Sequence, residues 1–537
     1  MDKQDNLHKR FQNAVRRKTN WRTTYKEALE YFSPQRDTFD DPQEGSKRTN
    51  TDRIFDSTGQ DALDEAVSNA QAEIFPPQKN WGKLKLGPLL KNRSSNVKEQ
   101  EKQLEEITDL FFTSLHNSNF DIQVAEFLED WMIGTGNMLM HKGTIDKPFI
   151  FEAIPLDQVY LERGKFGSVG GRFRKWKLPN HLIEKTWPDA KLSQTLRAAI
   201  ETNPYEETCI IEYTIEDRIK NKVLTQDRNG KSISKDQFIE GFRYIVQEEK
   251  TKEIIVEREN KSQPWINVRY AVSAGEVYGR GPVLKALADN KTLNKTKELI
   301  LKNAALAISG MWTVVDDGII NLENIVMEPG AKIPVMANPG NPNGPSIAPL
   351  RSGADFNVSQ IIIQDLVKSI KNILMAEPMG EIDAPVKTAT EIAHRAQRMA
   401  KRMGSPFGRM QSEGAEQIIM RGLYILEELG MINLEGFIVD GNNIGIQHVS
   451  PLAVAQDQEE LTAMTRYAEI VSGFFGPQGL MMMTNPVEFG AELSRLLGVK
   501  SNILPTQEQM DAIKQVLAQQ AGVAQGAQLE QPEQPIV

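Results

Sequence analysis

Six histidines and one cysteine are the side chains with the most versatile chemistry in this chain, because they can bind metals, attack electrophiles or transfer protons. The histidines are scattered over the sequence, without a His-x-x-x-His spacing or a Cys/His cluster. Zinc sites need several such ligands at short spacings, and the single cysteine, Cys209, excludes an intrachain disulfide. We therefore predict no metal site. His394, beside Arg395 on an expected helix, is interpreted as solvated or paired.

Phosphate-binding and two-carboxylate sites are not indicated either. The Gly-x-x-x-x-Gly-Lys-Ser/Thr pattern that cradles nucleotide phosphates does not occur. Gly279-Arg-Gly281 follows an extended stretch, but Pro282 removes the next amide donor that a phosphate would need. Neighbouring acids such as Asp316-Asp317 and Glu459-Glu460 stand at expected turns or helix starts, where the helix dipole favours carboxylates. The sequence therefore predicts no catalytic residue, no cofactor and no enzyme.

The composition is that of an ordinary globular protein with a slightly acidic balance. The 537 residues are enough for several domains, and 40% hydrophobic residues can supply substantial cores. A formal net charge of −9 argues against a protein that mainly grips nucleic acid, since neutralising phosphates needs an excess of Lys and Arg. Residues 1–20 are charged throughout, and no run reaches the ~18 consecutive apolar residues of a membrane span. We expect a soluble protein made in the cytoplasm.

The stretch from Tyr278 to Gly404 organises the rest of the chain. It begins with a Tyr-Gly-Arg-Gly-Pro turn, and helical periodicity follows over 283–306. A short β-like run at 311–315 and a Gly/Pro/Asn loop lead to a second helix over about 355–375, and a third helix starts near Thr388. The pattern predicts two helices joined by a small β excursion, followed by one long helix to about Leu429 with a bend at 404–406.

Both helices of the pair carry apolar stripes beside lysines. On the first helix, one stripe is formed by Ala286, Leu293, Ile300 and Ala304. A second stripe, on the roughly opposite face, is formed by Leu284, Ala288, Leu299 and Leu306. The face of the second stripe also carries Lys291, Lys295 and Lys302. The second helix has a single stripe, flanked by Lys368 and Lys371, of Ile363, Val367, Ile370 and Leu374. Two apolar stripes need neighbours on two sides. Two interpretations stay open: a helix hairpin in the core of a monomer, or a ring whose subunits pack side by side with lysines facing a shared centre.

The third helix has an apolar stripe of Ile392, Ala396, Met399 and Met403 beside a basic one of Arg395, Arg398, Arg402 and Arg409. A solvated helix face and a set of inter-subunit ion pairs both fit this pattern.

The flanking regions predict an α+β fold that is mainly helical. Before residue 277, helices are expected over 1–32, 60–74, 98–115, 122–136 and 182–200, and strands near 81–86, 149–155, 158–162, 171–177, 208–219, 242–247 and 253–257. The C-terminal part predicts a strand over 444–449, helices over 457–475, 487–497 and 506–519, and a disordered tail rich in Gln, Pro and Ala.

A set of short segments, in order along nearly the whole chain, resembles the head-to-tail connector (portal) proteins of short-tailed double-stranded DNA bacteriophages. The segments are Asp52–Gly59, Ile74–Pro77 with Trp81, Gly134–Gly136, Ala153–Tyr160, Pro264–Arg269, Tyr278–Pro282, Ala286–Asp289 with Leu293-Asn294, and Thr388–Glu391. Each is weak alone, and their common order is what makes the resemblance specific.

The resemblance implies a ring of twelve subunits around a DNA channel at one vertex of a virion. In element order it implies these parts: a wing (1–277), a first stem helix (278–308), a clip (309–353), a second stem helix (354–375), a channel loop (376–387), a long wing helix with a return strand (388–449), a helical crown (450–518) and a disordered tail (519–537).

The resemblance also implies partners and site residues. The partners are double-stranded DNA passing non-specifically through the channel, the terminase motor, a tail adaptor or nozzle protein, and the major capsid and scaffolding proteins. Candidate DNA-facing residues are Lys291, Lys295, Lys302, Lys368 and Lys371; the channel loop would present Glu377, Met379, Glu381, Asp383 and Lys387; and Arg395, Arg398 and Arg402 would lie between subunits. The competing hypotheses are another virion structural protein, of the capsid or tail, and a nucleic-acid-processing enzyme.

Overall fold

The computed structural model of the chain describes residues 3–36, 53–87, 97–226, 232–309, 312–314, 347–349, 356–376, 403–433, 444–449 and 463–476, with positions 461, 484, 489, 490 and 493. It divides into two compact units, each built from separate stretches of sequence. The first unit comprises Met1–Asn69, Ile122–Leu139 and Glu152–Ala384, and the second comprises Ala70–Asp121, Met140–Phe151 and Pro385–Val537. The described residues form a mixture of helices and antiparallel sheets.

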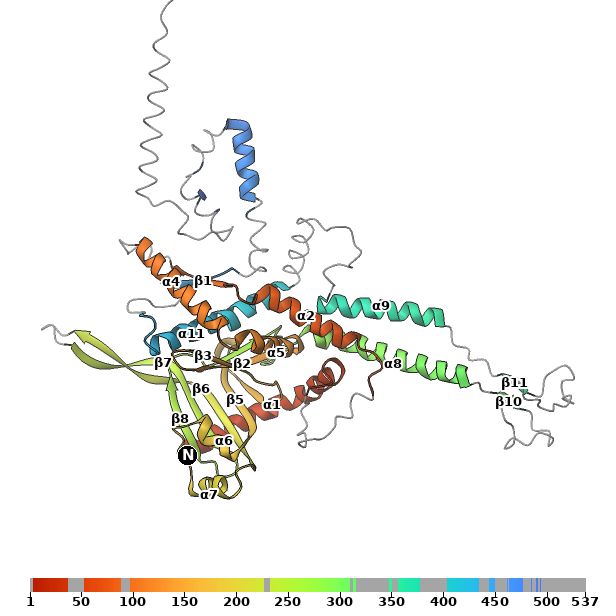
Figure 1. Ribbon diagram of the computed structural model, residues 1–537, viewed down its shortest axis with the longest axis horizontal. Coiled ribbons are helices and arrows are strands. Elements are labelled where there is room, and N and C mark those ends of the chain that lie inside the picture. The colour runs from red at the N-terminus through yellow and green to blue at the C-terminus, as the bar shows by residue number, and fades with distance from the viewer. Residues whose placement is uncertain are drawn as a thin grey trace, which may run out of the picture. The chain divides into compact units, whose positions relative to one another are not determined.

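A five-stranded antiparallel sheet of order β4-β5-β6-β7-β8 lies in the first unit (Figure 1). Its strands are β4 (Val159–Arg163), β5 (Val169–Pro179), β6 (Glu207–Gln226), β7 (Ser232–Glu248) and β8 (Ile254–Asn260). Both faces are covered, because neighbouring residues of a strand point to opposite faces. Ile210 packs with α6 (Asn180–Thr186) and α7 (Gln194–Thr202), whereas the next residue, Ile211, packs with Leu7, Phe11 and Ala14 of α1 (Lys3–Phe32).

Strands β6 and β7 extend well beyond the rest of the sheet. Their register pairs run from Ile210↔Glu248 to Gln226↔Ser232, whereas the pairing of β6 with β5 ends at Ile215 and that of β7 with β8 ends at Phe242. The prediction gave only 208–219 and 242–247, because the polar, lysine-rich sequence between them lacks the alternation of a half-buried strand.

The helix predicted over 182–200 is wrong as one element. It is divided into α6 and α7, and Trp187 and Pro188 separate them. Proline cannot donate the amide hydrogen bond that a continuing helix requires. Helix α7 then restarts at Ser193, whose hydroxyl accepts a hydrogen bond from the Leu196 amide at 3.1 Å.

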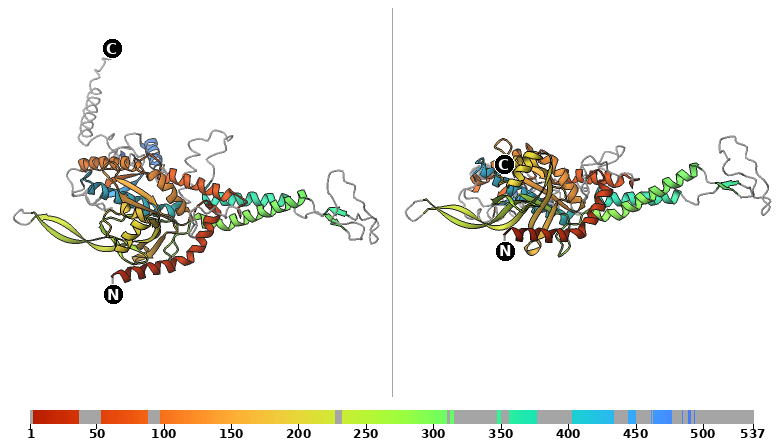
Figure 2. Two further views of the ribbon diagram at one scale, coloured as in Figure 1. Left: turned by 60° about the horizontal axis from the view of Figure 1, so that its bottom comes forward. Right: turned by 90° about the horizontal axis from the view of Figure 1, so that it is seen from below.

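Helices α8 (Pro282–Ser309) and α9 (Phe356–Leu374) of the first unit lie side by side in every view (Figures 1 and 2). They confirm the helices predicted over 283–306 and 355–375. Between them, β10 (Trp312–Val314) pairs antiparallel with β11 (Ile347–Pro349). Further described elements of this unit include the first part of α2 (Thr58–Ile74), most of α5 (Phe120–Ile133), and the antiparallel pair of β2 (Thr135–Lys142) with β9 (Trp265–Arg269).

Aromatic side chains form the core of the second unit. Trp81 makes edge contacts with Phe75 and with Phe112 of α4 (Val97–His116), at ring-centroid distances of 5.0 and 5.1 Å. Strand β1 (Gly82–Leu86) pairs antiparallel with β12 (Ile444–His448), and β3 (Phe149–Ala153) begins in this unit.

The bend predicted at 404–406 is wrong, because the helix is continuous there. Residues 403–409 are helical, a π-helical turn, η4, occupies Met410–Ala415, and α11 continues over Glu416–Glu428. Within that turn the Ser412 hydroxyl donates to the Gly408 carbonyl at 3.1 Å, a back-bond that competes with regular helix bonds.

Candidate functional site

The start of α8 is fixed by close backbone contacts, and these explain the Tyr-Gly-Arg-Gly-Pro sequence. The Gly281 amide donates to the Ile133 carbonyl at 2.9 Å, and the Gly279 amide donates to the Thr135 hydroxyl at 2.9 Å. A Cβ at Gly281 would overlap the Met132 carbonyl, so no other residue fits there. The two glycines therefore allow close packing of backbone on backbone.

Buried polar contacts hold the middle of α8 to the first unit. The Asn294 amide donates to the Arg53 carbonyl at 2.9 Å, and its oxygen accepts from the Phe55 amide at 2.6 Å. Lys297 forms an ion pair with the buried carboxylate of Asp56. Burial raises the pKa of Asp56, but hydrogen bonds from Lys297 and Thr58 outweigh that effect and lower it below its usual value. The first half of α8 is thus rigidly positioned.

One predicted stripe of each helix is buried where α8 and α9 meet. Ala286 and Leu293 of α8, and Ile370 and Leu374 of α9, have 0% exposure. Across this contact the Ser369 hydroxyl donates to the Asp289 carboxylate at 2.7 Å. The stripe predicted for α9 therefore packs on α8.

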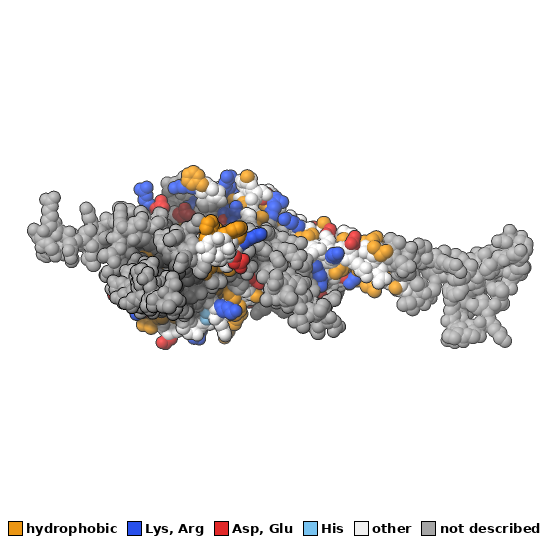
Figure 3. Space-filling view, turned by 90° about the horizontal axis from the view of Figure 1, so that it is seen from above, with side chains coloured by type: hydrophobic (Ala, Val, Ile, Leu, Met, Phe, Trp, Pro, Cys, Tyr) orange, Lys and Arg blue, Asp and Glu red, His pale blue; other side chains and the backbone are white. Residues whose placement is uncertain are grey.

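Other large aliphatic residues of the pair remain exposed. Leu299 is 50% exposed, Leu301 is 55% and Ile361 is 66%. Figure 3 shows hydrophobic side chains among charged ones along the part of the molecule that these helices form. Ala288 and Leu299, from the second predicted stripe of α8, are both exposed in the single chain. Helices α8 and α9 thus expose apolar surface to water, and another protein surface can cover it.

Three of the predicted DNA-facing lysines already have acidic partners. Lys295 and Lys302 both bind Glu298, at 2.9 and 2.6 Å, and their hydrogen bonds lower the pKa of Glu298. Lys291 binds Glu27 of α1 at 2.5 Å. By contrast, Lys368 and Lys371 of α9 have no acidic partner within the described residues, and Lys368 is exposed. The five lysines are therefore not equivalent.

The remaining predicted site residues lie outside the described residues. They are Glu377, Met379, Glu381, Asp383, Lys387, Arg395, Arg398 and Arg402. Arg409, the last residue of the predicted basic stripe, lies in the second unit and binds Glu413 within the same helical segment at 2.9 Å. That bond is local to one chain.

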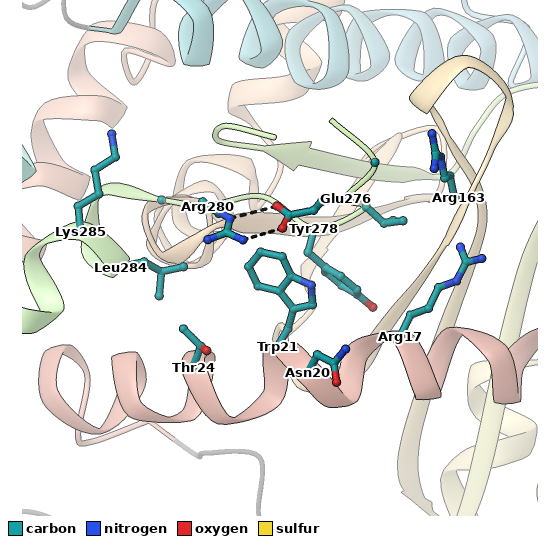
Figure 4. A pocket seen from close by; sticks show the side chains of 13 residues that line it. Arg17, Asn20, Trp21, Thr24, Arg163, Glu276, Tyr278, Arg280, Leu284 and Lys285 are labelled. Atoms are coloured by element: carbon teal, nitrogen blue, oxygen red, sulfur yellow. Dashed lines mark hydrogen bonds and ion pairs between the residues drawn. The ribbon is translucent and has the colours of Figure 1, made fainter. Parts of the chain in front are cut away.

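A basic cleft of about 830 Å³ in the first unit was not foreseen from the sequence. Helix α1, the end of β4, the loop 275–281 and the first turn of α8 form its walls. In Figure 4, Arg17 and Arg163 lie at one end and Lys285 at the other, with Trp21, Glu276 and Arg280 between them. The sequence signal was Arg17 and Trp21, four residues apart on one helix, but their cleft partners come from more than 100 positions away.

Two contacts order the centre of the basic cleft. Arg280 donates to both carboxylate oxygens of Glu276, at 2.6 and 3.0 Å, and these bonds lower the pKa of Glu276. The Arg280 guanidinium also lies 4.9 Å from the Trp21 ring centroid, and Tyr25 stacks on Trp21 at 5.4 Å. The charged pair and the stacked rings hold α1 against the loop before α8.

Among the residues that the structure describes, no group of three or more His, Cys, Asp or Glu side chains is arranged to hold a metal ion. Within the same residues, no helix is long and apolar enough to span a membrane.

The comparisons with known proteins point to one family. The family model described as "Bacteriophage head to tail connecting protein" matches residues 4–504. A similar curated protein, named "Probable portal protein" and from Bordetella phage BPP-1, is 21% identical over 516 residues, which are 95% of this chain and 90% of that protein.

Two solved structures of gene transfer agent particles also resemble the chain. A chain of a native virion is 12% identical with a TM-score of 0.35, and a chain of the neck of an empty particle is 11% identical with a TM-score of 0.37. Both matches cover 84% of this chain and 95% of the other. These scores are too low to carry an argument about fold. The family match over residues 4–504 is sufficient: the chain belongs to the bacteriophage head to tail connecting proteins, and its function is that of a phage portal.

Proposed function

We propose that this portal protein works as a ring of twelve identical subunits, in which the α8–α9 helix pairs stand side by side around a channel for double-stranded DNA. The exposed aliphatic residues of the pair carry the proposal. Leu299, Leu301 and Ile361 expose apolar area on helices whose other stripe is already buried. In a ring, the helix pair of the next subunit covers this area and recovers the free energy of its burial.

The charges of α8 support a conduit that surrounds DNA without holding it. Each phosphate neutralised by a lysine adds salt-dependent affinity. Glu298 binds both Lys295 and Lys302, and the chain as a whole carries −9. DNA would therefore slide past this helix with weak attachment, and Lys368 and Lys371 of α9 supply the remaining attraction.

The other parts of the molecule take their proposed roles from their order along the chain. Residues 1–277 form the wing, 309–353 the clip that contacts the terminase motor and later the tail adaptor, and 376–387 an acidic channel loop. The helix and return strand of 388–449 join the channel wall to the wing, and 450–518 form the crown. Arg395, Arg398 and Arg402 would then make inter-subunit ion pairs. The capsid vertex of the virion is the proposed location, with capsid and scaffolding proteins as neighbours, and no enzymatic step is assigned to the chain.

Charge introduced on the exposed aliphatic surface should prevent ring formation. We expect the double variant Leu299→Glu/Ile361→Glu to remain folded by circular dichroism but to sediment as a monomer, because each interface would bury unpaired carboxylates. Ile145→Glu is the matched control. Ile145 is similarly exposed, at 67%, but it lies in the loop between β2 and β3, outside the helix pair. Analytical ultracentrifugation should show rings for the control and wild type. Rings of the double variant with wild-type stability would contradict the proposal.

A further inference from the structure

The basic cleft carries more positive charge than its own chain neutralises. Arg17, Arg163 and Lys285 are exposed and have no acidic partner within the described residues. The one carboxylate in the lining, Glu276, has both oxygens bonded to Arg280. Three cations gathered around one hollow repel each other unless an anionic group enters. The chemistry of the cleft therefore calls for an occupant that carries carboxylates or phosphates.

The aromatic contacts favour a protein surface over nucleic acid. Single-stranded nucleic acid binds through bases stacked on open aromatic faces. Trp21, the aromatic side chain at the centre of the cleft, already contacts the Tyr25 ring and the Arg280 guanidinium. A base would compete with both contacts, whereas carboxylates need only reach the three unpaired cations.

An acidic surface of matching charge lies on α2 of the same unit. We call Asp61, Asp64 and Glu65 the acidic patch; Asp61 and Asp64 are exposed, whereas Ala62 and Leu63 face the interior. None of the three carboxylates has a basic partner within the described residues. Partial burial raises the pKa of Asp64, and the negative charges of Glu129 and Asp61 raise it further. The acidic patch thus lacks the cations that the basic cleft has in excess.

The acidic patch and the basic cleft lie against different sides of α8. Helix α2 begins against Asn290, because Gly59 lies so close to that side chain that a Cβ would overlap it. The cleft is lined by Gly281 and Lys285. At about 100° per residue, Asn290 is about 140° around α8 from Lys285.

We propose that the basic cleft of one subunit receives the acidic patch of the next subunit in the ring. The inference rests on the ring of the proposed function and names a second contact in it, besides the aliphatic surface of α8 and α9. Head-to-tail rings need two different, complementary surfaces on each subunit. The basic cleft and the acidic patch are two such surfaces, and their opposite charges favour the head-to-tail orientation over a symmetric dimer, which would bring like charges together.

Charge reversal on either side should prevent assembly, and mixing the two variants should restore it. The cleft variant is Arg17→Glu/Lys285→Glu, and the patch variant is Asp61→Lys/Asp64→Lys; all four residues are exposed. In each variant alone, like charges meet at every interface, so we expect loss of the ring peak in ultracentrifugation. In an equimolar mixture the two variants can alternate around the ring and every interface again joins opposite charges. We expect rings to return in the mixture.

The outcomes separate this inference from the proposed function. Wild-type protein that forms no ring would overturn the proposed function. If the wild type forms rings and either variant alone also forms rings, only the cleft-to-patch contact is overturned. The same holds if both variants are folded but their mixture forms no ring. A charge-reversal control at two exposed cations elsewhere, Lys191→Glu/Arg197→Glu, should leave the rings intact. If this control also forms no rings, the loss of rings in the cleft and patch variants is due to net charge, and the cleft-to-patch contact is overturned.

Discussion

At the scale of single residues, the partners of a lysine decide whether it can act on DNA. Lys295 and Lys302 share Glu298, so together the three residues present about one positive charge, whereas Lys368 and Lys371 present two. The sequence placed all five on helix faces correctly. Glu298, on the same helix, could have identified Lys295 and Lys302 as paired, whereas the partner of Lys291 is Glu27 on α1, which helical spacing does not reveal.

This difference should be measurable with purified protein. Replacing Lys368 and Lys371 by glutamine should weaken the binding of double-stranded DNA several-fold and make its dependence on salt shallower, since fewer phosphates are neutralised. Lys295→Gln/Lys302→Gln should have a smaller effect on the salt slope. Fluorescence anisotropy at several salt concentrations compares the two. An equal slope for all variants would contradict a role of Lys368 and Lys371 on DNA.

A buried lysine joins α1 to the loop before β4. The Lys18 ammonium donates to the carbonyls of Leu156, Asp157 and Val159 at 2.5, 2.7 and 2.7 Å. Lys18→Met keeps the length of the side chain but leaves these carbonyls without the donor, so we expect unfolding to become easier by about 3 kcal/mol. The control Lys9→Met, at an exposed position of the same helix, should change stability by less than about 0.5 kcal/mol. Urea unfolding followed by tryptophan fluorescence measures both, and equal midpoints would contradict the buried role.

The basic residues of α1 show what sequence alone leaves out at this scale. Helical spacing predicted one helix over 1–32, which α1 confirms. The same spacing gave no reason to separate Lys18, which is buried, from Arg17, which lines the basic cleft. Their different environments come from β4 and the loop 275–281, which are distant in sequence.

At the scale of elements, periodicity located most helices and missed strands that are buried on both faces. Strand β9 is buried at every residue, and β2 is buried at its first six positions, so neither shows the alternation that marks a half-exposed strand. The pair α8 and α9 was found because each helix has a clear stripe of period 3.6. The break between α6 and α7 should have been expected from Pro188, since proline interrupts a helix.

The junction between β2, α5 and α8 depends on a glycine that the chain cannot replace. Gly281→Ala would push a methyl group into the Met132 carbonyl, so we expect a loss of at least about 2 kcal/mol in unfolding free energy. The matched control is Gly408→Ala, since Gly408 lies in a helical segment with free space around it and alanine should stabilise that helix slightly. Thermal unfolding by circular dichroism distinguishes them. A Gly281→Ala protein as stable as the control would show that the close contact can relax.

At the scale of the whole molecule, the family was within reach of the sequence because the resembling segments are short turns and helix starts whose residues are fixed by close contacts. Gly134 and Gly279 meet each other backbone to backbone, and Gly281 meets the Met132 carbonyl. The proposed ring would leave a weaker trace in one chain. Its traces would be the exposed apolar area on α8 and α9 and the separated charge around α8, which neighbouring subunits would cover and pair.

Electron microscopy of the purified wild-type protein tests this account most directly. Negatively stained particles should be rings of one size with a central hole, and their rotational averages should show the same number of subunits in every well-centred class. Rings that enclose a channel support both the aliphatic contact of α8–α9 and the conduit for DNA. Monomers at high protein concentration, with the fold intact by circular dichroism, would contradict the central claim that this chain acts as a self-assembling ring.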